Sequence, residues 1–143
     1  GSNRIQSIDD FSFSNLINLE TLKIWNNKLT EIKQNTFSNL QNLIELDLNM
    51  NKIQSIDENS FASLKNLTEL NLRSNKLSEI KQNSFLNLKN LLILDLDTNK
   101  IEFVNESSFA SLTNLMELNL RSNKLKEIGK NTFLNLANLY SLY

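Results

Sequence analysis

Apolar residues recur along this chain with a constant period of 24 residues. Each complete copy follows the pattern LxxLxLxxNKLxxIxxxxFxxLxN, with isoleucine or valine at some of the leucine and isoleucine positions. Full copies occupy 19–42, 43–66, 67–90, 91–114 and 115–138, and partial copies occupy 3–18 and 139–143. Because no residue is inserted or deleted between copies, the sequence predicts one array of stacked coils, 1–143, and not several domains.

The LxxLxL part of each copy predicts a short β-strand. In the copy 43–66, Leu46 and Leu48 fall on one face of this strand, and Glu45 and Asp47 fall on the other. One coil of this size cannot bury its leucines by itself. We therefore expect the coils to stack strand against strand, about 4.7–4.9 Å apart, into a parallel sheet over a shared core.

Two further residue types recur once in each coil. A phenylalanine column is expected to form a stacked aromatic row inside the array, and it comprises Phe13, Phe37, Phe61, Phe85, Phe109 and Phe133. An asparagine follows each strand, where its amide can satisfy backbone groups of neighbouring coils, at Asn3, Asn27, Asn51, Asn75, Asn99 and Asn123. A second asparagine set precedes the strands and is interpreted as turn residues, at Asn18, Asn42, Asn66, Asn90, Asn114 and Asn138.

Composition argues against catalytic and cofactor chemistry. The chain has no cysteine and no histidine, so thiol nucleophiles, imidazole bases and the commonest metal ligands are missing. Its two glycines and its lack of proline leave no glycine loop for phosphate. Exposed carboxylates on an open sheet lack the burial that tunes catalytic groups. We expect no enzyme activity, no cofactor and no metal site.

Charge and hydropathy limit the kinds of partner that we expect for this chain. The formal net charge of −1 gives no field that would attract nucleic acid. The longest uninterrupted apolar run, 91–94, is too short to cross a bilayer, so we expect no membrane insertion of this segment. The sequence contains no signal peptide.

The repeat pattern resembles the typical 24-residue class of leucine-rich repeats, found in Toll-like receptors, Slit-type guidance proteins, small proteoglycans and variable lymphocyte receptors. The resemblance covers essentially the whole chain. It implies an α/β solenoid, a right-handed leucine-rich-repeat superhelix with a concave parallel β-sheet and a convex side of short helices, turns and loops. It also implies an extracellular or cell-surface location. Arrays of that class usually end in cysteine-bearing caps, so we expect this chain to be a fragment that lacks them.

Such solenoids bind partners on the concave sheet. We therefore predict a protein-recognition module of a receptor-like or secreted protein. The alternative is a passive structural, adhesin or engineered repeat scaffold without a specific ligand. The candidate binding residues project from the concave face, where Trp and Arg favour hot spots. They are Lys23, Trp25, Glu45, Asp47, Met50, Glu69, Asn71, Arg73, Ile93, Asp95, Asp97, Glu117 and Arg121.

Three weaker features remain. A row of positive residues beside the asparagines is either a solvated column or a site for an anionic glycan, and it contains Arg4, Lys28, Lys52, Lys76, Lys100 and Lys124. Apolar residues of the first and last coils predict some end-to-end self-association or fraying. Two triplets, Asn66-Leu67-Thr68 and Asn105-Glu106-Ser107, fit the acceptor pattern for N-glycosylation, which is no more than chance would give.

Overall fold

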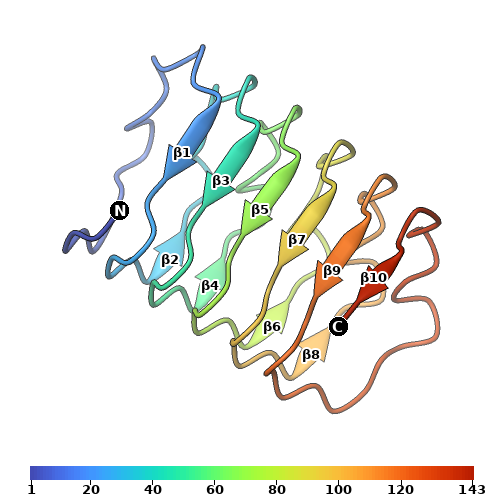
Figure 1. Cartoon of the computed structure of the whole chain (residues 1–143). Helices are drawn as coiled ribbons and strands as arrows, with labels where there is room; N and C mark the ends of the chain where they lie inside the picture. The colour runs from blue at the N-terminus through green and yellow to red at the C-terminus, as the bar shows by residue number, and fades with distance from the viewer.

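The computed structural model describes all residues 1–143 as a stack of coils built on one six-stranded parallel sheet (Figure 1). Every strand pairs with the strand of the next coil, and their order in the sheet follows their order in the chain. These strands are β1 (Thr21–Lys23), β3 (Glu45–Asp47), β5 (Glu69–Asn71), β7 (Ile93–Asp95), β9 (Glu117–Asn119) and β10 (Ser141–Leu142). The predicted parallel sheet is therefore confirmed.

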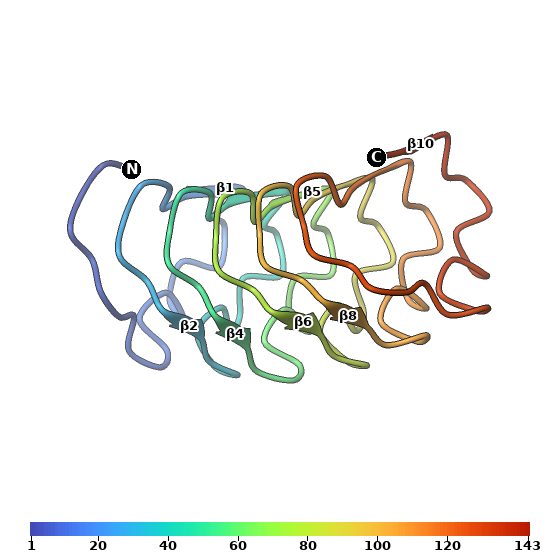
Figure 2. The same ribbon diagram turned by 90° about the horizontal axis from the view of Figure 1, so that it is seen from below.

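The side of the stack opposite the sheet consists of turns and very short strands (Figure 2). We call it the turn side. Its two-residue strands pair in parallel as β2 (Glu31–Ile32) with β4 (Ser55–Ile56), and as β6 (Glu79–Ile80) with β8 (Phe103–Val104). No residue of the chain lies in a helix. The predicted short helices of the convex side are therefore wrong.

The sequence of the turn side explains why helices do not form. In the coil of 43–66 the backbone makes successive i→i+3 hydrogen bonds, from Ser60 N to Asp57 O, from Ala62 N to Asn59 O and from Leu64 N to Phe61 O. Asn59 adopts a left-handed backbone with φ 63°, which interrupts any helical run. The Asn and Ser residues here also favour turns, because their side chains compete for backbone hydrogen bonds.

The core contains the recurring apolar residues. It comprises 29 buried residues, and the leucines of the sheet and the phenylalanines of the turn side contribute to it together. The phenylalanine rings stack in sequence, with centroids 5.9–6.3 Å apart and planes within 7–13° of parallel. Phe37, Phe61 and Phe85 are fully buried. The aromatic row is confirmed.

The asparagine that follows each strand joins adjacent coils. The Nδ2 of Asn75 donates to Leu72 O in its own coil at 3.0 Å and to Leu48 O in the preceding coil at 3.1 Å. Its Oδ1 accepts from Ile53 N of the preceding coil at 3.0 Å. Equivalent bonds surround Asn51 and Asn99. Its Nδ2 also donates to Arg73 O at 3.2 Å, so one buried amide bonds four backbone groups on two coils, as predicted.

The second asparagine set does more than form turns. The side-chain Nδ2 of each of four members donates to a carbonyl of the preceding coil at 2.9 Å: these are Asn42, Asn90, Asn114 and Asn138. These bonds lie at the exposed rim of the stack, so they link coils without a large desolvation cost. The coils are therefore joined by amides at both ends of the strands.

The outermost coils expose part of their apolar cross-section. Ile5 is 40% exposed, Phe11 55% and Leu142 49%, whereas Ile8 and Leu139 pack partly against the core. Such surfaces fit the expected end-to-end self-association, which stays a prediction.

Replacing Asn75 with alanine should lower the free energy of unfolding by about 1–3 kcal/mol. The change leaves the buried N–H of Ile53 without a partner, which costs about that much. Leu48 O and Leu72 O each lose one of two amide donors and keep the other, from Asn51 and Asn99. Asn90→Ala is the matched control: it removes one exposed bond and should cost under about 1 kcal/mol. Urea unfolding followed by circular dichroism measures both, and equal losses in the two variants would contradict the buried-amide argument.

Candidate functional site

The solvent-facing side of the six-stranded sheet, here called the sheet face, presents side chains in straight columns. The strand register places one residue of each coil directly beside the next. The first column is Thr21, Glu45, Glu69, Ile93, Glu117 and Ser141, and the second is Lys23, Asp47, Asn71, Asp95 and Asn119. The 13 predicted site residues lie on β1, β3, β5, β7 and β9 or within three residues after one of these strands.

The second column has a structural role that the sequence did not indicate. Its Asp and Asn side chains accept a hydrogen bond from the backbone N–H two residues further on, at 2.9–3.1 Å. Asp47 bonds Asn49 N in this way, and Asp95 bonds Asp97 N. One oxygen of each such side chain is therefore committed to the end of its strand, which leaves less of the group for a partner.

Two carboxylates of the first column are paired. Lys23 Nζ lies 2.7 Å from Glu45 Oε1, and this hydrogen bond raises the pKa of Lys23. The Tyr140 hydroxyl donates to Glu117 Oε1 at 2.6 Å, and this bond raises the pKa of the tyrosine. Between them, Glu69 is exposed and has no ion-pair partner.

Asp97 is buried, although the sequence suggested an exposed contact residue. It accepts a hydrogen bond from the Thr98 hydroxyl at 2.9 Å, and its Oδ2 lies 3.3 Å from a guanidinium nitrogen of Arg73. Burial acts to raise the pKa of Asp97, but hydrogen bonds from Thr98 and Ser122 and the charge of Arg73 outweigh it, so the pKa is lowered. Asp97 therefore stays ionised and holds Arg73 in place.

Arg73 and Met50 share a shallow hollow at the end of the strands. Its other lining residues are all polar: Asn26, Asn49, Asn51 and Ser74. The Arg73 side chain is 54% exposed, and Met50 is also 54% exposed. Met50 has a left-handed backbone with φ 54°, a conformation that favours glycine and asparagine over methionine. An exposed apolar side chain thus lies beside a fixed cation.

Trp25 is less accessible than the sequence suggested. Its indole ring packs against Gly1, so closely that a Cβ added at Gly1 would overlap the ring. The backbone N–H of Ser2 also donates to Trp25 O at 2.9 Å. Trp25 is therefore half-buried at the edge of the sheet face, whereas Ile93 is exposed in its centre.

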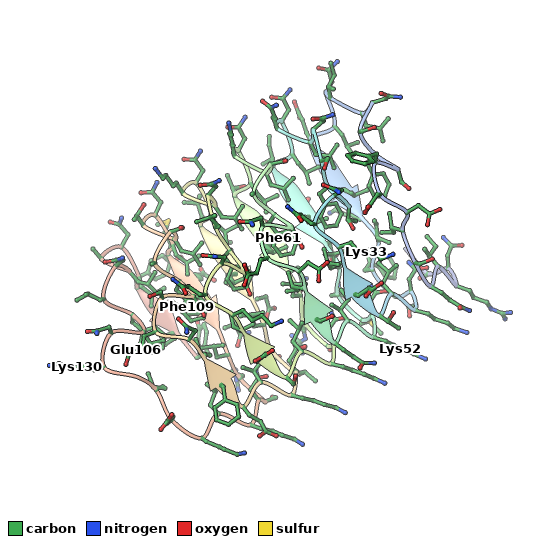
Figure 3. All side chains as sticks on the ribbon, turned by 180° about the vertical axis from the view of Figure 1, so that it is seen from behind. Lys33, Lys52, Phe61, Glu106, Phe109 and Lys130 are labelled. Carbon is green, nitrogen blue, oxygen red and sulfur yellow. The ribbon has the colours of Figure 1, made fainter.

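The positive row beside the asparagines forms a separate edge of the stack. All of its members are exposed, and none lies within ion-pair distance of a carboxylate. Lys52 extends away from the ribbon in Figure 3. The row therefore presents uncompensated positive charge, which the sequence left open.

Phe103 is a surface feature that the sequence reasoning missed. It lies on β8 and is 52% exposed, with Lys126 Nζ 5.1 Å from its ring centroid. The available signal was its position in the repeat, because the neighbouring coils carry Glu79 and Glu127 there. An aromatic residue in a polar column costs hydrophobic free energy and calls for a physical explanation.

No group of three or more Asp or Glu side chains is arranged to hold a metal ion. Nor does the chain contain a helix that could cross a membrane.

Asp97 and Asp95 should contribute to stability with opposite signs. The pKa of Asp97 is lowered in the fold, so its stabilisation is complete above the ordinary aspartate pKa and is lost as pH falls through the lowered value. The pKa of Asp95 is raised, chiefly by burial, so its penalty is present at neutral pH and disappears on acidification. At pH 7, Asp97→Asn should lower the melting temperature and Asp95→Asn should raise it. Both differences should shrink toward pH 3, and a pH-independent difference would contradict this assignment.

Comparison with known proteins agrees with the repeat architecture. Residues 17–77 match the family described as "Leucine rich repeat", and residues 49–143 match "BspA type Leucine rich repeat region (6 copies)". The chain has no match among curated proteins.

Three solved structures are similar over most of this chain. A chain of the Drosophila Toll–Spatzle complex (glycosylated form) is 29% identical over 98% of this chain, with a TM-score of 0.86. A chain of the octameric complex of Latrophilin 3, Unc5D and FLRT2 (LRR) is 28% identical over 86%, with a TM-score of 0.79. A chain of the TLR13–ssRNA13 complex is 33% identical over 94%, with a TM-score of 0.66.

This chain spans 20%, 38% and 22%, respectively, of those three chains. The matching family region covers 49–143, well over half of the sequence, and the stacked coils agree with it. The chain therefore belongs to the leucine-rich repeat family.

Proposed function

We propose that this chain is a protein-recognition module of a secreted or cell-surface receptor-like protein, and that its sheet face binds the partner. The observation that carries the proposal is the hollow shared by Met50 and Arg73, because it combines exposed apolar area with an oriented cation. Arginine and apolar anchors of this kind dominate protein interfaces.

The arrangement of Arg73 supports this role. Its partner Asp97 is buried and ionised, so the guanidinium is oriented before a ligand arrives and loses less side-chain entropy on binding. Asp97 contacts one side of the Arg73 guanidinium. A guanidinium has five N–H donors, so others remain free to bind a carboxylate or carbonyl of the partner.

The rest of the sheet face suggests the chemistry of the partner. Glu69 and Ile93 are adjacent in the sheet register, exposed and free of ion pairs. They offer one negative and one apolar contact on the sheet face. A folded protein surface that presents a basic residue, an acidic residue and an apolar side chain would complement this pattern.

Two of the three similar structures support a protein ligand. They are complexes between proteins, one of Toll with Spatzle and one of FLRT2 with Latrophilin 3 and Unc5D, whereas the third is a complex of TLR13 with ssRNA13. The glycosylated form of the Toll–Spatzle complex is the basis for proposing a secreted or cell-surface location here.

The proposal is tested with a partner selected against the wild-type chain from a library displayed on a surface. We expect Arg73→Glu to weaken binding at least about tenfold, since it places a negative charge next to Asp97 and reverses the contact with the partner. Met50→Ala and Trp25→Ala measure how much these two apolar side chains contribute to the affinity. Titration by biolayer interferometry measures each dissociation constant.

Lys89→Glu is the matched control, because it makes the same charge change at an exposed position away from the sheet face. Its affinity should stay within about twofold of wild type. Partners that tolerate Arg73→Glu, Met50→Ala and Trp25→Ala would overturn the sheet-face assignment. A chain that yields no specific binder at all would favour the passive scaffold.

A second candidate is an anionic glycan bound along the lysine edge. The specific observation is that the lysines of five successive coils are exposed and free of ion pairs, so they repeat at the spacing of adjacent strands, about 4.8 Å. A linear sulfated polysaccharide could contact several of them at once, and its affinity would come from many weak charge contacts.

Retention on immobilised heparin tests this candidate. We expect the double variant Lys52→Glu/Lys76→Glu to elute at markedly lower salt than wild type. The control Lys65→Glu/Lys89→Glu has the same net charge, with both changes off the lysine edge, and should elute close to wild type. Equal losses in the two variants would show that only net charge matters.

A further inference from the structure

At one place on the turn side, the residue types depart from those at the same repeat positions in the other coils. At 24-residue intervals, Phe103 occupies a position that carries Ser55 and Glu79 in the preceding coils, and Asn105 occupies one that carries Asp57 and Lys81. The next coil has Gly129 beside Asn105, where earlier coils have charged residues. Three departures from the pattern therefore meet on adjacent coils, which points to a local role different from packing.

We propose that Asn105 is an acceptor site for N-linked glycosylation, with Phe103 as the platform for the first sugar. The site lies outside the sheet face, and the inference does not depend on partner binding there. Asn105, Glu106 and Ser107 form an Asn-x-Ser triplet directly after β8.

The reactive atom of Asn105 is accessible. Asn105 is exposed, and its Oδ1 accepts a hydrogen bond from the backbone N–H of Ser107 at 2.9 Å. Its Nδ2 donates to no group of the chain, in contrast to the amides that join the coils. The nitrogen that would receive the sugar is therefore not needed for folding.

The middle and last residues of the triplet leave Asn105 uncovered. The Glu106 side chain turns toward the next coil, where it accepts from Asn131 Nδ2 at 3.1 Å (Figure 3). It occupies the space over Gly129, since a Cβ added there would lie 2.6 Å from Glu106 Cγ. Ser107 is exposed, and its hydroxyl makes no hydrogen bond within the chain.

Phe103 supplies a surface for the sugar. Residues i and i+2 of an extended segment project to the same side, and Phe103 and Asn105 line one shallow hollow on the turn side. A pyranose ring presents an apolar C–H face that packs on an aromatic ring and removes apolar area from water. This contact would account for an aromatic residue that is otherwise left 52% exposed.

The other triplet of the chain differs in its second and third residues, although Asn66 is also exposed and its amide makes no hydrogen bond within the chain. In Asn66-Leu67-Thr68 the middle residue is completely buried, and the Thr68 hydroxyl donates to Ile44 O at 3.2 Å. No exposed aromatic residue precedes Asn66. The triplet at Asn66 is therefore a matched internal control with the same acceptor pattern in a different setting.

The reaction is a group transfer without redox change. Asn105 Nδ2 forms a bond to C1 of the first sugar of a lipid-pyrophosphate-linked oligosaccharide, and the C1–O bond to the pyrophosphate breaks. The leaving lipid pyrophosphate keeps the bonding electron pair, and the amide proton passes to a base of the transferase.

The test uses the full chain with an added secretion leader and an unrelated glycosylation tag at its C-terminus, secreted from eukaryotic cells. Intact mass and peptide mapping before and after glycosidase measure the occupancy of each asparagine. We expect glycan at Asn105 and at the tag. Asn105→Gln and Ser107→Ala should each remove the chain's own glycan, and Asn66→Gln should leave it unchanged.

Phe103→Ser tests the platform. We expect lower occupancy at Asn105 and loss of the rise in melting temperature that the glycan gives the wild-type chain. Secreted protein with the tag occupied and Asn105 empty would overturn the proposal, as would glycan on Asn66 in place of Asn105. An unchanged occupancy and melting shift in Phe103→Ser would overturn the role of Phe103.

Discussion

Stacking of the coils depends on asparagine amides that are shared between neighbours. Asn51 Nδ2 donates to Leu48 O in its own coil and to Ile24 O in the coil before it, while its Oδ1 accepts from Leu29 N. Leu29 N has no other acceptor, so it would cost free energy if the amide were absent. Each carbonyl is shared by the amides of two successive coils, Ile24 O by Asn27 and Asn51 and Leu48 O by Asn51 and Asn75. The same contact fixes the register that lets the phenylalanine rings stack and the leucines meet in one core. No coil can satisfy its own backbone without the next, which makes the array cooperative over nearest neighbours.

That constraint leaves few positions free for function. The leucine, phenylalanine and asparagine columns are fixed by burial. In the column of Asp47 and Asn71, every member after Lys23 accepts a hydrogen bond from the end of its strand. Exchange of Asp for Asn in this column preserves the bond and changes only the charge. In the proposed function, recognition therefore falls to residues such as Arg73, Glu69 and Ile93, whose side chains are exposed.

The sequence predicted the parts of the fold that follow from periodicity. The sheet, the stacked row that includes Phe61 and the bonding of Asn75 follow from residue type and spacing alone. Helices on the turn side were predicted from family resemblance and not from the pattern, and the turns around Asn59 replace them. The burial of Asp97 could not be foreseen, because it depends on hydroxyls of its own and the next coil and on Arg73 of the previous one. The membership of the sheet face was predictable, whereas the pairing of its charges was not.

The sheet face and the turn side can carry different functions. A bulky oligosaccharide at Asn105 would lie on the turn side, behind the sheet face and away from the Arg73 hollow (Figures 1 and 2). It would therefore not obstruct a partner on the sheet, and it would cover the exposed ring of Phe103. Because coils bond only to their neighbours, a change at Phe103 alters the local surface without shifting the sheet register two coils away. A repeat array can in this way acquire a modification site in one coil and a binding site in another, and each can vary while the shared amides and leucines stay fixed.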